Sequence, residues 1–180
     1  MRVVVTGSEC TGKTTLAKAL ADHFGVPCVA EYARLFVRAR ERAPEVSDVD
    51  AIARGQIALE DEHAASGHRL LILDTDLLST VLYSFHYYGT CPSWVEVEQA
   101  RRTGDLYLLP GIDVPWVPDG SQRDRGHRRE EMQQLFRDAL AQRSLNAVEF
   151  TGSIDDRLRT AIAAIGAAAR LRRASAHNSP

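Results

Sequence analysis

The chain has 180 residues, a formal net charge of −2, and 44% hydrophobic and 26% charged residues. These values are typical of one globular domain, and no apolar run approaches the roughly 20 residues that a membrane-spanning helix needs. The negative charge argues against bulk attraction to nucleic acid, and three cysteines without a CxxC pair argue against a disulfide framework or a zinc site. We therefore expect neither a membrane nor a nucleic-acid partner.

The first predicted elements are a strand, a loop and a helix. Residues 3–5 are three valines, which favour a short buried strand, and residues 14–24 carry apolar side chains at helical spacing before Gly25 and Pro27. Because the chain enters this strand directly after Met1, we expect no signal peptide and a cytoplasmic location.

The loop between them reads Gly-Ser-Glu-Cys-Thr-Gly-Lys-Thr, the pattern of a P-loop. Such a loop holds a triphosphate with backbone N–H groups at a helix N-terminus, its lysine reaches the β- and γ-phosphates, and the next hydroxyl binds magnesium. We therefore predict ATP and Mg²⁺ as cofactors, with nucleotide contacts from Gly7, Ser8, Glu9, Cys10, Thr11, Gly12, Lys13, Thr14 and Thr15. The alternative is a glycine-rich turn that contains Gly-Lys-Thr by chance.

The next segment predicts a strand over 27–30, a helix over 31–42, and a further helix that Ser47 caps and that ends near Ser66. Residues 70–73 are a continuous apolar run, as in a parallel strand buried on both faces, and this run ends at Asp74.

Carboxylates follow two of these strands. Asp74 is expected near the phosphate loop, where it could hold magnesium together with Thr14, as a Walker B aspartate does. Glu31, Asp74 and Asp76 are candidates for the catalytic base, and the sequence does not decide among them. For both aspartates the alternative is a helix N-cap, and for Glu31 it is a favourable position at a helix N-terminus.

The second half continues the alternation of helices and strands. We predict helices to about Tyr88 and over 93–102, 130–142 and 154–171, strands over 106–109 and 147–150, a lid loop over 111–126, and a frayed tail over 172–180. The expected fold is one α/β domain over 1–171, a doubly wound, mostly parallel five-stranded sheet of the nucleotide-kinase type that binds ligands at the carboxyl ends of its strands.

Arginines in and after the lid are candidates for contacts with the ATP phosphates, and we favour Arg123 and Arg128 as catalytic residues beside Lys13. The alternative for Arg128 is a pair with the following glutamates. His86 and the aromatic residues Tyr83, Phe85, Tyr87 and Tyr88 could stack on a ring of the substrate, but helical spacing favours the core, which is the interpretation we prefer.

Taken together, these segments resemble the nicotinamide riboside kinase domain of the bacterial bifunctional NAD-biosynthesis regulator and its free-standing AAA-type ATPase relatives. The resemblance covers residues 2 to about 171 and is carried by GSECTGKTT from Gly7, EYAR from Glu31, LDTD from Leu73, PWVPDGSQRD from Pro115 and HRREEMQQLFRDAL from His127.

The resemblance implies transfer of the ATP γ-phosphoryl group to the 5′-hydroxyl of nicotinamide riboside, a small substrate. The chain departs from the family at Ala30 and has no aromatic residue from Ser47 to Leu73, where the family is expected to hold the pyridine ring. Another nucleoside, nucleotide or sugar kinase and a non-enzymatic ATP sensor remain alternatives. The sequence does not indicate an oligomeric state.

Overall fold

The computed structural model describes residues 1–116 and 128–177. Its centre is a sheet of five parallel strands, in the order β2-β3-β1-β4-β5. The strands are β1 (Arg2–Val5), β2 (Cys28–Val29), β3 (Leu71–Asp74), β4 (Leu106–Pro110) and β5 (Ala147–Phe150). The predicted doubly wound α/β fold is confirmed, with every strand pair parallel.

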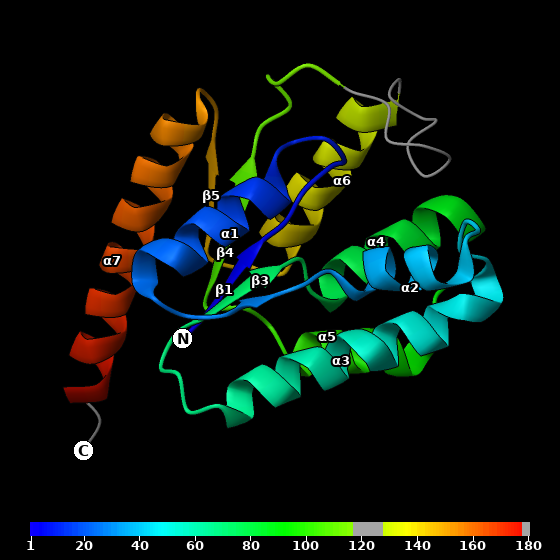
Figure 1. The fold of residues 1–180 in the computed structure, drawn as a ribbon, viewed down its shortest axis with the longest axis horizontal. Coiled ribbons are helices and arrows are strands. Elements are labelled where there is room, and N and C mark those ends of the chain that lie inside the picture. The colour runs from blue at the N-terminus through cyan, green and yellow to red at the C-terminus, as the bar shows by residue number, and fades with distance from the viewer. Residues whose placement is uncertain (117–127, 178–180) are drawn as a thin grey trace.

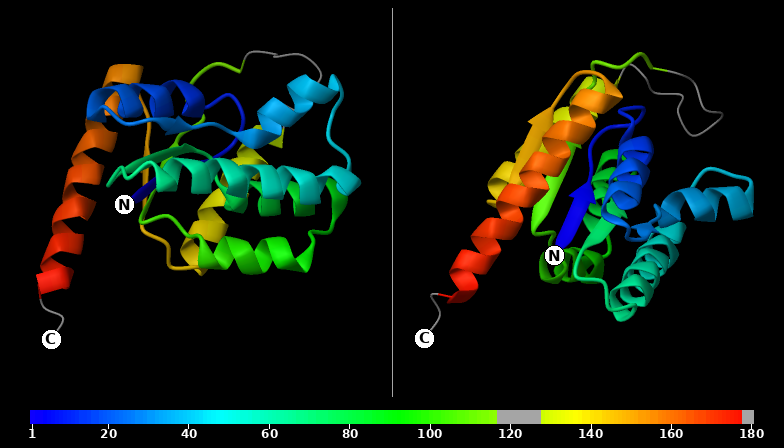
Figure 2. Two further views of the ribbon diagram at one scale, coloured as in Figure 1. Left: turned by 60° about the horizontal axis from the view of Figure 1, so that its bottom comes forward. Right: turned by 60° about the vertical axis from the view of Figure 1, so that its left-hand side comes forward.

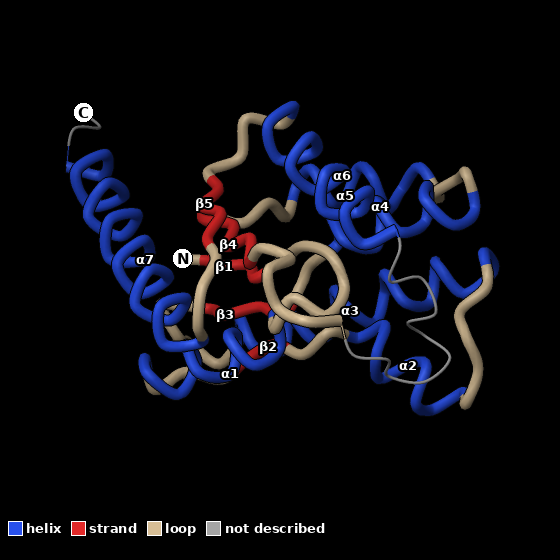
Figure 3. The backbone as a smooth tube through the Cα atoms, turned by 90° about the horizontal axis from the view of Figure 1, so that it is seen from above, coloured by secondary structure: helices blue, strands red, loops and turns tan. Residues whose placement is uncertain are grey.

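Helices cover both faces of the sheet. Helices α1 (Lys13–Phe24) and α7 (Ile154–His177) lie on one face, and α3 (Val49–Ala65), α4 (Leu77–Tyr88) and α6 (Arg129–Gln142) lie on the other, as Figure 3 shows. Helix α2 (Tyr32–Arg40) packs on α3, and α5 (Ser93–Arg101) packs on α4 (Figures 1 and 2). Within the described residues, no helix is both long and apolar enough to cross a membrane.

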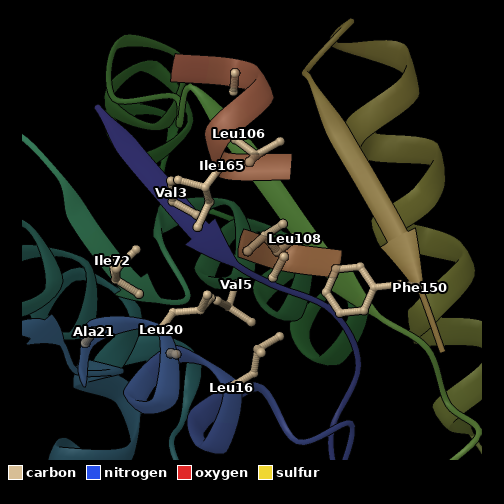
Figure 4. Close-up of a cluster of buried hydrophobic side chains, with 13 residues drawn as sticks. Val3, Val5, Leu16, Leu20, Ala21, Ile72, Leu106, Leu108, Phe150 and Ile165 are labelled. Carbon is tan, nitrogen blue, oxygen red and sulfur yellow. The ribbon is translucent and has the colours of Figure 1, made fainter. Parts of the chain in front are cut away.

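The alternation of side chains along β1 divides the core into two layers. Val3 and Val5 point towards α1 and α7, into the cluster drawn in Figure 4, whereas Val4 packs with the cluster under α6. All three valines are fully buried, which explains why this strand is an unbroken apolar run. The phosphate loop that follows β1 therefore leaves from the buried central strand of the sheet.

The predicted N-cap at Ser47 is wrong. A short 3₁₀ turn, Val46–Asp48, precedes α3, and its capping box pairs Glu45 with Asp48. The Asp48 carboxylate accepts a hydrogen bond from the backbone N–H of Glu45 at 2.9 Å and binds Arg42 at 2.6 Å. The Arg42 ion pair and the capping box fix the 3₁₀ turn ahead of α3, and a search for serine caps does not detect either of them.

The last helix is longer than predicted. Helix α7 continues through His177 in place of a frayed tail from residue 172, and in Figures 1 and 2 its end projects past the sheet. Residues 162–174 are rich in alanine and arginine, which are strong helix formers, and Arg172 forms an ion pair with Asp105 before β4.

Candidate active site

The phosphate loop runs from the end of β1 to the start of α1. Gly7 and Gly12 have φ values of 127° and 80°, and Cys10 also lies in the left-handed region at 54°. A Cβ atom on Gly7 would come within 2.8 Å of Leu109 Cδ1, so the close approach requires glycine there. The loop delivers the chain to Lys13, the first residue of α1, whose N-terminal N–H groups suit an anion.

Three side chains from distant parts of the sequence hold the backbone of this loop. The amide oxygen of Gln133 accepts the N–H of Ser8 at 3.0 Å, Arg129 Nη2 donates to the carbonyl of Cys10 at 2.9 Å, and Arg157 Nη1 donates to that of Thr11 at 2.6 Å. Sequence reasoning missed Gln133 and Arg157, and it predicted phosphate contacts for the arginines after the lid without predicting that Arg129 holds the loop backbone. The partners of these three side chains lie 119 to 146 residues away, so no local pattern marks them.

Lys13 is buried within the loop, and its ammonium group donates to the carbonyl of Ser8 at 2.6 Å. Burial lowers the pKa of Lys13, while the nearby carboxylates of Glu31 and Asp74 act in the opposite direction. The amine thus lies near Glu31 and Asp74, two of the residues that the sequence predicts for catalysis.

Thr14 and Asp74 are in direct contact. The Thr14 hydroxyl donates to Asp74 Oδ2 at 2.7 Å, while the other oxygen, Oδ1, is buried and has no hydrogen-bond partner among the described residues. Burial raises the pKa of Asp74, although the Thr14 hydrogen bond lowers it. A hydroxyl beside an unsatisfied carboxylate oxygen fits a magnesium ion that takes its other ligands from water and phosphates.

Asp76 has a structural role in place of the catalytic role that we predicted for it. It is the N-cap of α4, where Oδ1 accepts the N–H of Leu78 at 3.0 Å and Oδ2 accepts the hydroxyl of Tyr107 at 2.8 Å. It is 3% exposed, and burial raises its pKa to about 7. The N-cap alternative therefore describes Asp76, and Asp74 is the aspartate beside the loop.

Glu31 precedes the first residue of α2 and lines a cavity of about 390 Å³ together with Lys13. Arg34 Nε donates to Glu31 Oε2 at 3.1 Å. The backbone N–H of Tyr32 is held by Gln56 of α3 at 2.9 Å, which fixes the start of α2 against the cavity wall.

The cavity changes character along its length. Glu9, Lys13, Glu31 and Arg34 line the part beside the phosphate loop, and α2, α3 and α4 supply apolar and aromatic lining residues. Three of these lining residues are tyrosines of α4: Tyr83, Tyr87 and Tyr88. We expected all three in the core, and Tyr83 does pack against the buried cluster under α6 while it also lines the cavity. Tyr83 and Tyr87 stack with their ring centroids 5.7 Å apart, and Tyr88 donates to the carbonyl of Pro44 at 2.6 Å. Phe85 is 44% exposed, so it is not a core residue.

The lid arginines are only partly described. Arg123 and most of the predicted lid fall within residues 117–127, outside the described residues. Arg128 binds Glu131 through two hydrogen bonds of 2.8 Å, which is the pairing given above as its alternative. Its neighbour Arg129 contacts the phosphate loop through the carbonyl of Cys10.

Comparisons with known proteins agree with this geometry. The AAA domain family matches residues 2–157. The trifunctional NAD biosynthesis/regulator protein NadR of Escherichia coli (strain K12) is 31% identical over 154 residues, which are 82% of this chain and 37% of NadR.

Solved structures give the same relationship. A crystal structure of NadR with NAD and AMP-PNP has a TM-score of 0.72 at 25% identity and covers 91% of this chain and 48% of that chain. NadR in complex with NR has a TM-score of 0.77 at 24% identity, with 91% and 49% covered. Thymidylate kinase from Ehrlichia chaffeensis shares the fold, with a TM-score of 0.66 at 16% identity and 92% and 98% covered. The chain thus spans less than half the length of the NadR chains that it matches.

Proposed function

Because this chain belongs to the AAA domain family and is homologous to NadR, we propose that it is an ATP-dependent kinase that phosphorylates the 5′-hydroxyl of nicotinamide riboside to give nicotinamide mononucleotide. The observation that carries the proposal is the cavity of about 390 Å³, which has Lys13 and Glu31 in its wall beside the phosphate loop and stacked tyrosines in its wall on α4. A phosphoryl acceptor needs such a space next to the phosphate donor.

The phosphate loop binds ATP in this proposal. Its N–H groups and Lys13 hold the phosphates, and Thr14 and Asp74 hold magnesium, which supplies Lewis-acid stabilisation of the charge on the transferring group. Lys13 leaves the Ser8 carbonyl when a phosphate oxygen becomes available.

Glu31 is the group best suited to orient or deprotonate the acceptor hydroxyl. It lines the cavity with Lys13, whereas Asp74 is engaged by Thr14 and Asp76 caps α4. The Arg34 contact places a positive group beside the Glu31 carboxylate.

The cavity wall supports a cationic ring as the acceptor base. The pyridinium ring of nicotinamide riboside carries a fixed positive charge, and tyrosine faces attract cations by about 0.5–2 kcal/mol depending on burial. Glu9 adds a carboxylate near Tyr87, whose hydroxyl lies 3.4 Å from Glu9 Oε1. These aromatic residues stand on α4, so they replace the aromatics that the chain lacks at residue 30 and from Ser47 to Leu73.

The test is ADP formation from magnesium ATP across ribosides, nucleosides and sugars, with a control without acceptor. Nicotinamide riboside should stimulate turnover, and the neutral ribosides uridine and cytidine should do so weakly because their rings carry no positive charge. Tyr83→Leu should raise KM for nicotinamide riboside more than KM for ATP, since Tyr83 lines the acceptor cavity and not the phosphate loop. Preference for a neutral nucleoside would replace the proposed acceptor with another nucleoside.

Two alternatives have their own outcomes in that experiment. The fold shared with thymidylate kinase favours a nucleotide acceptor, but a monophosphate needs cations, and the described residues of the cavity wall include only Lys13 and Arg34 as basic side chains. A non-enzymatic ATP sensor predicts slow hydrolysis that no acceptor accelerates.

A further inference from the structure

A second, smaller cavity adjoins the phosphate loop on the side of α6. It measures about 10 Å³, close to the space that one water-sized atom needs, and Ser8, Trp116 and Arg129 contribute to its wall. Each of these residues has a buried side-chain atom without a hydrogen-bond partner in the described part of the chain, namely Ser8 Oγ, Trp116 Nε1 and Arg129 Nε. Buried polar atoms are nearly always hydrogen-bonded, so three of them around one cavity indicate a polar ligand atom.

The guanidinium group of Arg129 is fixed in orientation. Its Nη1 donates to the carbonyl of Val114 at 2.8 Å and its Nη2 donates to that of Cys10 at 2.9 Å. Arg129 therefore joins the segment that carries Trp116 to the phosphate loop, and its Nε is a buried donor without a partner among the described residues. Arg129 is also the first residue of α6, so the positive end of that helix dipole lies at the same place.

The chemistry of the three atoms selects the ligand. An indole N–H and a guanidinium N–H can only donate, and the serine hydroxyl can donate as well, so the ligand atom must accept at least two hydrogen bonds. This excludes a metal cation and fits either a water oxygen or an anionic oxygen, and the charge of the wall favours the anionic one. Glu9, which also lines the cavity, is the one acidic side chain in its described wall, against the two arginines Arg128 and Arg129.

The neighbouring lysine indicates where that oxygen comes from. Ser8 supplies both a hydroxyl to the small cavity and the carbonyl that Lys13 contacts at 2.6 Å. Since the lysine of a P-loop reaches the β- and γ-phosphates, the small cavity lies beside the terminal phosphate. We propose that Ser8 Oγ, Trp116 Nε1 and Arg129 Nε bind one oxygen of the γ-phosphate of ATP. This deepens the proposed kinase function, on which it rests, by naming the groups that distinguish ATP from ADP.

Tryptophan fluorescence tests the proposal without an acceptor. The chain has two tryptophans, and Trp94 is bound to Asp50 through Nε1 at 2.9 Å, so Trp94→Phe leaves Trp116 as the sole reporter. In that variant, magnesium AMP-PNP should change the Trp116 emission and magnesium ADP should not, with binding of both nucleotides measured by equilibrium dialysis. An equal response to the two nucleotides, or none to bound AMP-PNP, overturns the proposal. If no acceptor supports turnover, the proposed function fails while this readout still decides the inference.

A kinetic comparison gives a second readout. Trp116→Phe removes one donor and should lower kcat by about 10-fold or more, because a donor aimed at developing charge acts in the transition state. Its affinity for ADP should stay within about twofold of the wild type, since ADP lacks the γ-phosphate. Trp94→Phe is the matched control and should keep the wild-type kcat. Equal kcat values in the two variants would contradict the inference, and thermal unfolding of both checks that Trp116→Phe is folded.

Discussion

Replacing Arg157 by methionine should both destabilise the protein and weaken nucleotide binding. Arg157 is 3% exposed and donates to the carbonyls of Gly152 at 2.8 Å and Thr11 at 2.6 Å, besides its ion pair with Asp113. Hydrogen bonds from a charged group contribute about 1.5–3 kcal/mol each but do not add fully, so we expect a loss of about 3 kcal/mol. For a domain of this size that corresponds to a fall in Tm of about 6–12 °C.

The measurement is thermal and urea unfolding together with ATP binding by calorimetry at a temperature where both proteins are folded. ATP affinity should fall by about tenfold or more, because the freed Thr11 carbonyl loosens the loop that holds the phosphates. Arg159→Met is the control on the same helix. Its side chain is 75% exposed and pairs with Asp156, so its Tm and ATP affinity should match the wild type. If the two variants have the same Tm and the same ATP affinity, Arg157 does not support the phosphate loop.

Lys13→Ala should lower acceptor-dependent ADP formation by about 100-fold or more, because a cation is lost from the transferring phosphoryl group, and retained turnover would refute the mechanism. Asp76→Asn should reduce the pH dependence of stability. The Asp76 pKa is raised from 3.8 to about 7, so its contribution is full below pH 3.8 and is lost as the pH rises to about 7. Urea unfolding should therefore show the wild type losing stability relative to Asp76→Asn across that range, and parallel curves would contradict this pKa. Gly7→Ala should cost about 2–4 kcal/mol because its Cβ meets Leu109 at 2.8 Å with φ at 127°. Gly89→Ala, at φ 70° with no atom within 4 Å, should cost less in the same unfolding assay, and equal losses would exclude the steric explanation.

The local sequence pattern was enough to predict the central strand, the phosphate loop and the position of Asp74. The valines of β1, the glycines of the loop and Asp74 at the end of β3 are each marked by their immediate neighbours in sequence. Because parallel strands end at the same edge, those neighbours also predicted that Asp74 would lie beside the loop, and Thr14 does contact it.

The walls of the site were harder to predict, since they depend on which helix face meets which neighbour. Tyr83 and Tyr87 have the same helical spacing whether they face a core or a cavity, and only the position of α2 and α3 decides between the two. Arg128 and Arg129 are adjacent and chemically identical, yet one pairs with Glu131 and the other holds the loop. Tertiary packing determines which neighbour each of these side chains contacts.

The contacts that hold the phosphate loop have a consequence for biosynthesis. Its nine residues leave the ribosome well before the three side chains that hold their backbone, because Gln133, Arg129 and Arg157 are separated from their partners by 125, 119 and 146 residues. A nascent chain therefore carries the complete motif long before it has the support that shapes it. We expect tight ATP binding to appear only after both α6 and α7 have docked on the sheet, because these helices carry the three side chains.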